Sequence, residues 1–303
     1  MRLLELQNRF PLDVIRDGDF NSLGMINGRL EKMLVFAQDR KYLKLLNKNE
    51  NICCVIANPD LHSEIRSDIA VAITEEPQEV FLGIHEWLNK ETSFYWKDFP
   101  SDIAQDVVVH PTAFVASQNV RIGHGTTIGP NASILEKTLI GRDVVVEAGV
   151  TIGTKGFEFK RIGDAIVPVS HAGGVEIGDR VEIQANSAIS RGLYSDCTTL
   201  GNDTKLDNLV HIAHGAQVGE RCLIAASAMV AGSVVIGNDV WIGPGARISN
   251  GVKICDRAKV SLGSVVINDV DVGVRVSGNF AVPHKNFAKL MAAIRRGSFG
   301  SSR

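Results

Sequence analysis

Aliphatic residues recur at every sixth position through the second half of the chain, without a break from Leu200 to Val266. Small or β-branched residues lie four positions after these aliphatics, as at Ala216 and Val234. A strict period of six matches neither an amphipathic helix nor an alternating strand. It predicts a parallel β-helix, in which three hexads form one triangular coil with the aliphatic side chains stacked inside. The aliphatic series is Leu200, Leu206, Ile212, Val218, Ile224, Val230, Ile236, Ile242, Ile248, Ile254, Val260 and Val266.

In a coil of this kind, the number of residues between two positions in the sequence determines how far apart they lie in space. Three hexads make 3 × 6 = 18 residues, so positions 18 apart occupy the same place on successive coils. Strands that pair in a sheet lie about 4.8 Å apart. Side chains one coil apart are therefore expected to be neighbours.

The same period governs an earlier stretch that begins at Ile122 and is interrupted after Ile152. Residues 154–174 form an excursion with two aromatics, three basic residues and a closing Gly-Gly. The period resumes at Ile177 and slips by one residue across 190–199. Because ordering a long loop is costly, we expect the excursion to line a site or to contact a neighbouring subunit.

The remainder of the chain lacks hexads and predicts two further parts. Residues 1–100 read as a small α/β domain, with strands at 33–36 and 52–57 and helices at 41–47 and 80–89. Residues 101–278 then form the β-helix. Residues 279–303 are expected to form a short basic helix at 285–296 and a tail, with the helix capping the open end of the coil stack.

Composition narrows the function classes. The net charge of −2 provides no basic surface for nucleic acid. The five cysteines are odd in number and form no CxxC pair, so neither a disulfide framework nor a zinc site is indicated. The chain has neither a signal-peptide core nor an apolar run of membrane-spanning length. We therefore expect a cytoplasmic protein without a membrane span, a bound metal or a permanently bound cofactor.

His214 is the first candidate for chemistry. It lies two residues after the inward-facing Ile212, so its side chain should leave the core, and histidine is the usual general base near neutral pH. Gly232 lies one coil further on, since 214 + 18 = 232. A glycine N–H at a corner can approach a developing oxyanion, which makes acyl transfer a hypothesis for this pair. A surface histidine without a role is the alternative.

Several segments resemble the UDP-3-O-acylglucosamine N-acyltransferase family, which performs the N-acylation step of lipid A synthesis. The resemblance rests on residues 174–192 and on 205–214, which reads KLDNLVHIAH. Residues 18–20 (GDF) and 35–42 (VFAQDRKY) are similar to the family's uridine-binding segment. The resemblance implies a left-handed β-helix, a homotrimer with the donor in the cleft between subunits, and an acyltransferase acting on a nucleotide-linked amino sugar.

The resemblance also implies roles for individual residues. His214 matches the general base that deprotonates the sugar amine, Gly232 the backbone oxyanion donor, and Asp207 and Asn208 the histidine-supporting and acyl-pocket positions. A second set of residues matches substrate-binding positions of the family: Phe36, Tyr42, Asp39, Asn208, His211 and Asn250. Within this set, Phe36 and Tyr42 match the two aromatic rings that enclose uracil. Stacking of a base on aromatic rings contributes about 1–3 kcal/mol per base.

Four features depart from the family pattern. Ser190 replaces an aspartate, Asn250 a histidine and Asp39 an asparagine, and the long C-terminal helices are reduced to residues 285–296. These departures favour a relative that transfers a short acyl group from acyl-CoA to a nucleotide-linked amino sugar for a surface polysaccharide. The alternative is the lipid A enzyme itself, with a long 3-hydroxyacyl carrier protein as donor.

Two other function classes remain open from the sequence. One is a zinc hydratase of the γ-carbonic anhydrase type, with ligands among His124, His171, His211 and His214. Their spacing does not place three imidazoles around one ion. The other is a non-catalytic scaffold or nucleotide sensor, which would bind a nucleotide without turnover.

Overall fold

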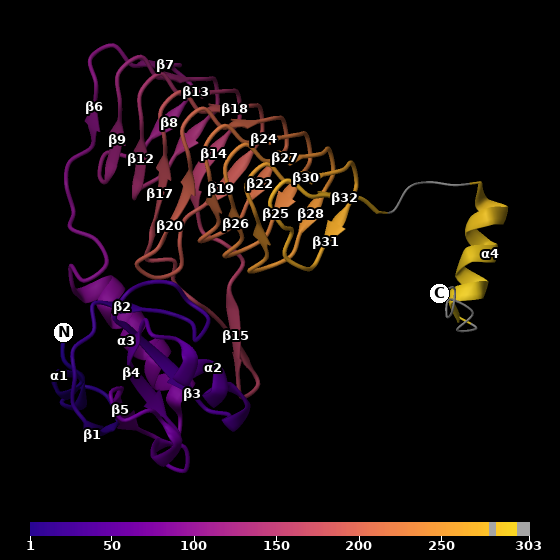
Figure 1. Cartoon of the computed structure of the whole chain (residues 1–303). Helices are drawn as coiled ribbons and strands as arrows, with labels where there is room; N and C mark the ends of the chain where they lie inside the picture. Colours follow the sequence, from indigo (N-terminus) through magenta and orange to yellow (C-terminus); the bar gives the residue numbers. More distant parts are fainter. Residues whose placement is uncertain (279–282, 296–303) are drawn as a thin grey trace.

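The computed structural model describes residues 1–278 and 283–295. An N-terminal α/β domain lies beside a long stack of β-helical coils, and a single helix follows at the C-terminal end (Figure 1). The fold is a left-handed parallel β-helix, as the period of six and the family resemblance predict.

The N-terminal domain is built on a five-stranded sheet with the order β1-β5-β4-β3-β2. Its strands are parallel except for β1, which runs antiparallel to β5. The longest helix, α3, starts with a proline in its first turn and buries Phe81, Ile84 and Leu88 against the sheet, at the spacing of an amphipathic helix. The elements are α1 (Leu3–Gln7), β1 (Asp13–Arg16), β2 (Ser22–Leu23), β3 (Met33–Ala37), η1 (Arg40–Tyr42), α2 (Leu43–Lys48), β4 (Ile52–Ala57), η2 (His62–Glu64), β5 (Ala70–Ile73) and α3 (Pro77–Glu91).

The β-helix has three flat faces, here numbered in chain order. The first face consists of β6 (Asp102–Ile103), β9 (Val120–Ile122), β12 (Thr138–Ile140), β17 (Gly174–Ile177), β20 (Cys197–Leu200), β23 (Gln217–Val218), β26 (Val235–Ile236) and β29 (Lys253–Ile254). The second consists of β7 (Val108–Val109), β10 (Thr127–Ile128), β13 (Val145–Val146), β18 (Glu182–Ile183), β21 (Lys205–Leu206), β24 (Leu223–Ile224), β27 (Trp241–Ile242), β30 (Lys259–Val260) and β32 (Arg275–Val276). The third consists of β8 (Phe114–Val115), β11 (Ser133–Ile134), β14 (Thr151–Thr154), β19 (Ala188–Ser190), β22 (His211–Ile212), β25 (Met229–Val230), β28 (Arg247–Ile248) and β31 (Val265–Val266).

The register of the coils follows the sequence period. Ile212 pairs with Val230 on the next coil, and Val230 with Ile248, so each step is 18 residues. The aliphatic side chains of the hexads form one continuous buried core. The smaller residues between them, such as Ala216 and Val234, are buried as well. The predicted coil is therefore confirmed.

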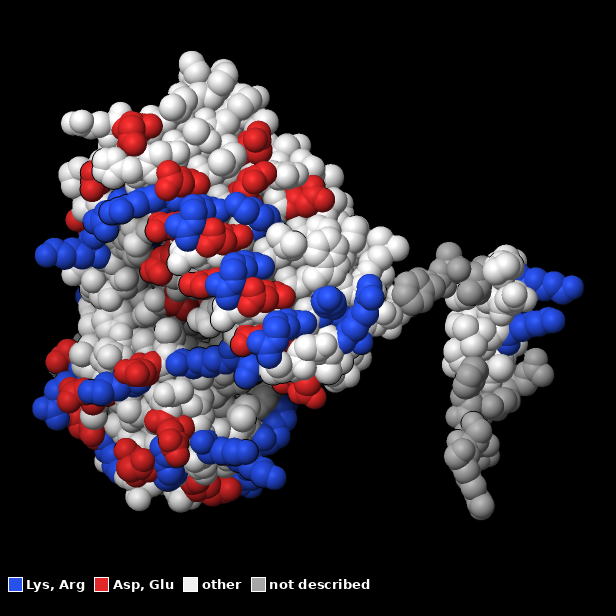
Figure 2. All heavy atoms as spheres, turned by 45° about the horizontal axis from the view of Figure 1, so that its top comes forward, with Lys and Arg blue, Asp and Glu red and all other residues white. Residues whose placement is uncertain are grey.

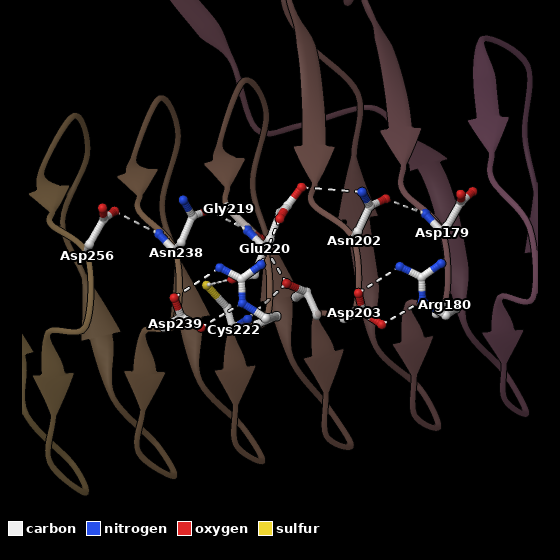
Figure 3. Close-up of polar contacts among 12 residues, drawn as sticks. Asp179, Arg180, Asn202, Asp203, Gly219, Glu220, Cys222, Asn238, Asp239 and Asp256 are labelled. Atoms are coloured by element: carbon white, nitrogen blue, oxygen red, sulfur yellow. Dashed lines mark hydrogen bonds and ion pairs between the residues drawn. The ribbon is translucent and has the colours of Figure 1, made fainter.

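Corners between the first and second faces are closed by side chains from the next coil. Asn238 Oδ1 accepts the backbone N–H of Glu220 at 2.8 Å, and Asp256 Oδ1 accepts that of Asn238 at 2.9 Å (Figure 3). Each acceptor satisfies an N–H that would otherwise lack a partner at the turn. Gly219 makes room for this contact, because a Cβ atom there would lie 2.6 Å from Asn238 Oδ1.

Charged pairs run alongside these corners. Arg180 pairs with Asp203 and Arg221 with Asp239, each at 2.8 Å, and Figure 2 shows such basic and acidic side chains interleaved in rows. The pairs are exposed, so each contributes at most about 1 kcal/mol. They fit the parallel register without adding much to stability.

The excursion at 154–174 is an antiparallel hairpin of β15 (Phe159–Ile162) and β16 (Ala165–Pro168) that reaches from the coil stack towards the N-terminal domain (Figure 1). The slip in the period also arises where the chain leaves the coil to contact the N-terminal domain. Its residues Leu193 and Tyr194 leave the coil and are buried in the core of the N-terminal domain. Tyr194 lies 5.8 Å from Phe81 and 4.9 Å from His85 between ring centroids.

His85 fastens the hairpin to α3. One ring nitrogen, Nε2, donates to the carbonyl oxygen of Ser170 at 2.7 Å, and Nδ1 accepts from the Tyr95 hydroxyl at 2.7 Å. Burial lowers the pKa of His85, which keeps the ring neutral and suits one donor and one acceptor. The two domains therefore share buried polar and aromatic contacts.

Part of the predicted C-terminal segment, residues 279–282 and 296–303, lies outside the described residues. Helix α4 spans His284–Arg295 and stands apart from the last coil (Figure 1), with Phe287, Leu290 and Ile294 exposed. Its capping role stays a prediction. Of the helices in residues 1–278 and 283–295, none combines the length and the apolar character needed to cross a membrane.

Candidate active site

His214 lies at the corner between the third and first faces, after β22 and before β23. The next residue, Gly215, has φ +65°, a conformation that favours glycine, and its N–H donates to Thr198 Oγ1 at 2.9 Å. The carbonyl oxygen of His214 accepts the N–H of Ser233 from the next coil. The backbone of His214 is thereby fixed, and its side chain is 16% exposed.

Two glycines bracket the imidazole. A Cβ atom on Gly232 would lie 2.7 Å from His214 Cε1. A Cβ atom on Gly156, at the start of the excursion, would lie 2.9 Å from His214 Cδ2. Any side chain at either position would collide with the ring, so both glycines are needed for its placement.

Acidic and basic side chains of the hairpin approach the imidazole. Glu158 Oε2 lies 3.8 Å from His214 Nε2, and Glu158 also pairs with Lys160 at 2.6 Å. Both side chains are largely shielded from solvent. A nearby carboxylate stabilises the imidazolium form of histidine, so Glu158 supports a base that becomes positively charged during a reaction.

A second histidine packs against the first. The ring of His171 lies 5.6 Å from that of His214 in an edge-on arrangement. His171 is 4% exposed, and burial, followed by the charges of His214 and Arg191, lowers its pKa to about 4. His171 is therefore neutral at pH 7 and adds no charge beside the candidate base.

The N–H of Gly232 already has an acceptor. It donates to Asn250 Oδ1, one coil further on, at 3.1 Å. The oxyanion donor expected from the sequence is thus hydrogen-bonded to a neighbouring side chain rather than free.

Glu158, Lys160 and the three coil residues His214, Gly232 and Asn250 line one cavity of about 400 Å³. Its walls come from four parts of the chain. They are the loop around Met25 and Arg29 in the N-terminal domain, Glu158 and Lys160 of the hairpin, residues 193–196 of the slip in the period, and the coil corners that carry His214, Gly232 and Asn250. The cavity thus combines a candidate base and a backbone amide with two cations and two carboxylates, Glu158 and Asp196. A base beside a backbone amide is a set that suits acyl transfer.

Comparisons with known proteins address the coil region. A family model described as "Bacterial transferase hexapeptide (six repeats)" matches residues 119–154 and 197–232. A second, described as "Hexapeptide repeat of succinyl-transferase", matches residues 233–267. The coil stack therefore contains hexapeptide repeats of the kind that these two transferase models describe.

Among curated proteins, this chain is similar to two that are named UDP-3-O-acylglucosamine N-acyltransferase. The one from Pseudomonas fluorescens (strain Pf0-1) is 41% identical over 105 residues, which cover 35% of this chain and 30% of the relative. The one from Pseudomonas syringae pv. tomato is 40% identical over 104 residues, 34% of this chain and 29% of the relative. The match thus spans less than a third of these relatives.

A solved structure titled "UDP-N-acetylglucosamine acyltransferase from Campylobacter jejuni" has a TM-score of 0.51 with this chain. It is 21% identical and covers 65% of this chain and 82% of its own. This likeness concerns the fold of the coil stack.

The structure brings together only part of the residues selected from the sequence. His214, Gly232 and Asn250 line the cavity. Asp207 instead closes the corner between the second and third faces, where its carboxylate accepts the N–H groups of Asn208 and Ala226. Asn208 Nδ2 donates to Gln184 at 3.3 Å, and His211 projects from the third face.

The expected uracil pair is also outside the cavity lining. The ring centroid of Phe36 lies 5.1 Å from that of Phe81. The ring centroid of Tyr42 lies 4.9 Å from Lys41 Nζ. Asp39 caps η1 by accepting the N–H of Lys41 at 3.0 Å. Their roles in nucleotide binding stay predictions.

Several cavity residues were not selected from the sequence. The excursion was expected to line a site, but nothing in its composition singled out Glu158 or Lys160. Arg29 carried no signal, because its place depends on how the N-terminal domain docks onto the coils. Tyr194 belongs to the slip in the hexad period, which marked the segment but not its partner.

Proposed function

We propose that this protein transfers an acyl group from a thioester to the amine of a UDP-linked, 3-O-acylated glucosamine. The names of the two curated relatives support the substrate class, and the cavity around His214 supports the chemistry. These relatives favour the lipid A type of reaction over the short acyl-CoA hypothesis that the departures at Ser190, Asn250 and Asp39 suggested.

The observation that carries the proposal is the placement of the His214 imidazole between Gly156 and Gly232, 3.8 Å from Glu158. An imidazole nitrogen of His214 accepts a proton from the amine as the amine nitrogen attacks the thioester carbonyl carbon. The carbonyl π electrons move onto oxygen to form a tetrahedral intermediate. The Glu158 carboxylate stabilises the resulting imidazolium.

Collapse of the intermediate restores the carbonyl and breaks the carbon–sulfur bond. The leaving sulfur takes the proton back from the His214 imidazolium, so the products are an amide and a free thiol. The base is regenerated without a covalent acyl-enzyme, a bound metal or a redox cofactor in the scheme. The thioester is supplied by acyl-CoA or an acyl carrier protein as co-substrate.

Two cations of the cavity suit the diphosphate of the acceptor. Arg29 extends from the N-terminal domain, and Lys160 extends from the hairpin. In the described part of the chain, Arg29 has no carboxylate within 4.0 Å, whereas Lys160 is paired with Glu158. An unpaired guanidinium favours bidentate contact with phosphate oxygens.

We also propose that the protein is a homotrimer. Within one subunit, Asp207 and Asn208 lie at a different corner of the prism from His214. If these two residues take part in the site, they must come from a neighbouring subunit. A sedimentation mass equal to that of the monomer at micromolar concentration would refute a site shared between copies.

The test is release of free thiol from a panel of acyl-CoAs and 3-hydroxyacyl carrier proteins, with UDP-linked amino sugars as acceptors. We expect turnover with a 3-hydroxyacyl carrier protein and a loss of about 10²–10⁴-fold in kcat for His214→Ala, the range of general-base catalysis. His124→Ala is the matched control, because that histidine is exposed and pairs with Asp106 on an early coil.

Each other outcome has a definite meaning. Turnover with a short acyl-CoA alone would support the alternative function in surface-polysaccharide synthesis. Full activity in His214→Ala would refute the assigned base. Nucleotide binding without turnover would indicate a sensor, and stoichiometric zinc would indicate a hydratase; within residues 1–278 and 283–295, no group of three or more metal-ligating side chains is placed to hold an ion.

A further inference from the structure

The contact between Asn250 and Gly232 lies in the lining of the cavity. Asn250 Oδ1 accepts the Gly232 N–H at 3.1 Å, and the same glycine lies directly against the His214 ring. All three residues line the cavity. The acceptor on this N–H is therefore within the space where an acyl donor would react.

The same type of contact occurs elsewhere as a structural device. At the corner between the first and second faces, Asn238 Oδ1 accepts the Glu220 N–H at 2.8 Å, also across 18 residues (Figure 3). That corner carries no histidine and does not line the cavity. Asn250 thus repeats a corner contact at a glycine that packs against the ring of the candidate base.

A single N–H cannot serve two acceptors at full strength. A donor that stabilises an oxyanion must lie about 2.7–3.1 Å from that oxygen. In this structure Asn250 Oδ1 occupies a position of this kind relative to the Gly232 nitrogen. A thioester carbonyl oxygen can reach this donor only after Asn250 Oδ1 has moved away.

We propose that Asn250 gates the oxyanion donor: its amide oxygen holds the Gly232 N–H until the donor's carbonyl oxygen displaces it. This inference rests on the proposed function, since it assigns Gly232 to the acyl-transfer step. The neutral carboxamide exchanges for a neutral thioester carbonyl at little net cost. The negatively charged oxygen of the tetrahedral intermediate then holds the N–H about twice as strongly as either neutral acceptor.

The charge of the gate determines how it acts. A carboxylate at residue 250 would accept the N–H more strongly than an amide and would repel the developing oxyanion. A methyl group there would leave the N–H free for the donor. Asn250→Asp and Asn250→Ala therefore have opposite effects on the donor, although both remove the amide.

The experiment compares these two variants with Asn238→Asp and Asn238→Ala, which change the same contact away from the cavity. For Asn250→Ala we expect the KM for the thioester to fall about fivefold, which corresponds to one net hydrogen bond of about 1 kcal/mol. For Asn250→Asp we expect kcat to fall about 10²–10³-fold, as when an oxyanion donor is lost. The Asn238 pair should match the Asn250 pair in melting temperature while leaving both kinetic constants unchanged.

Equal losses of kcat in Asn250→Asp and Asn250→Ala would overturn the gate, because they would show that the amide itself assists the reaction. Equal kinetic effects of the Asn238 and Asn250 variants would overturn it as well, because only corner stability would then be involved.

Hydrogen exchange of the Gly232 amide, followed in glycine-¹⁵N-labelled protein, separates the gate from the proposed function. If no donor is turned over, the proposed function fails, but faster exchange in Asn250→Ala than in wild type would still show that Asn250 holds the N–H. Identical exchange in the two proteins would refute the gate.

Discussion

At the scale of single residues, the imidazole of His214 fits between two glycines because neither carries a Cβ atom. Gly156 and Gly232 leave their Cβ positions empty, and the ring fills the space between them. A base held in one orientation loses little entropy on reaching the transition state. The spacing of 18 residues linked Gly232 to His214 in advance, whereas Gly156 reaches the ring through the hairpin and had no such link.

His171 offers a prediction at the same scale. Its folded-state pKa of about 4 lies below the ordinary value near 6.5, so between these values the unfolded chain binds a proton that the folded chain does not. Stability is therefore complete above pH 6.5 and is lost as the pH falls towards 4, by up to about 3 kcal/mol. We expect His171→Gln to reduce this loss, measured by urea unfolding at pH 7 and pH 4.5. An unchanged pH dependence would contradict the assigned environment; His85, whose pKa is also lowered, supplies the remainder.

At the scale of elements, several corners between the first and second faces combine a glycine with an acceptor from the next coil. The hexad pattern predicted the aliphatic interior because that pattern repeats in every coil. It did not predict the Asn238–Glu220 contact, since polar corner residues vary from coil to coil and several would satisfy the same N–H. The interior is thus easier to predict than the corners.

Gly219→Ala tests the corner geometry. The added methyl group would lie 2.6 Å from both Asn238 Oδ1 and the carbonyl oxygen of Gly237, and the latter belongs to the backbone. We expect a loss of about 1–3 kcal/mol, as for other overpacked sites, measured as a fall in the midpoint of thermal unfolding.

Gly83→Ala provides a control of opposite sign. Gly83 lies inside α3, and its nearest neighbour, Phe10, would be 3.5 Å from the added methyl group. Alanine is favoured over glycine in a helix interior by about 0.5–1 kcal/mol, so this variant should be stabilised. A Gly219→Ala protein as stable as wild type would show that the coil adjusts freely at this corner.

At the scale of the whole molecule, the cavity exists only where two domains and a hairpin meet. Arg29 from the N-terminal loop and Lys160 from the hairpin reach the same space as His214. The coil fold could be predicted from the sequence because it follows from a fixed period, and the same period placed the side chain of His214 outside the core. The facing side chains could not, because their positions depend on domain packing through Tyr194 and His85, which no periodicity encodes.

Arg29→Ala tests this shared cavity. Loss of a guanidinium that binds the diphosphate should raise the KM for the nucleotide sugar about tenfold, the effect of a charged hydrogen bond of about 1.5 kcal/mol. The KM for the thioester should not change. Lys44→Ala is the control, because Lys44 is exposed on α2 outside the cavity. Equal effects on both substrates would exclude a role specific to the acceptor.

The burial of Tyr194 in the N-terminal domain has a consequence for synthesis on the ribosome. Leu193 and Tyr194 complete a core whose other members include Leu3 and Phe81, yet they follow the end of α3 by about 100 residues (194 − 91 = 103). At translation rates of about 5–20 residues per second, this separation amounts to about 5–20 s. During that interval the emerging N-terminal domain exposes an apolar surface to which chaperones can bind. The surface is covered only when Leu193 and Tyr194 have been synthesised and pack against it.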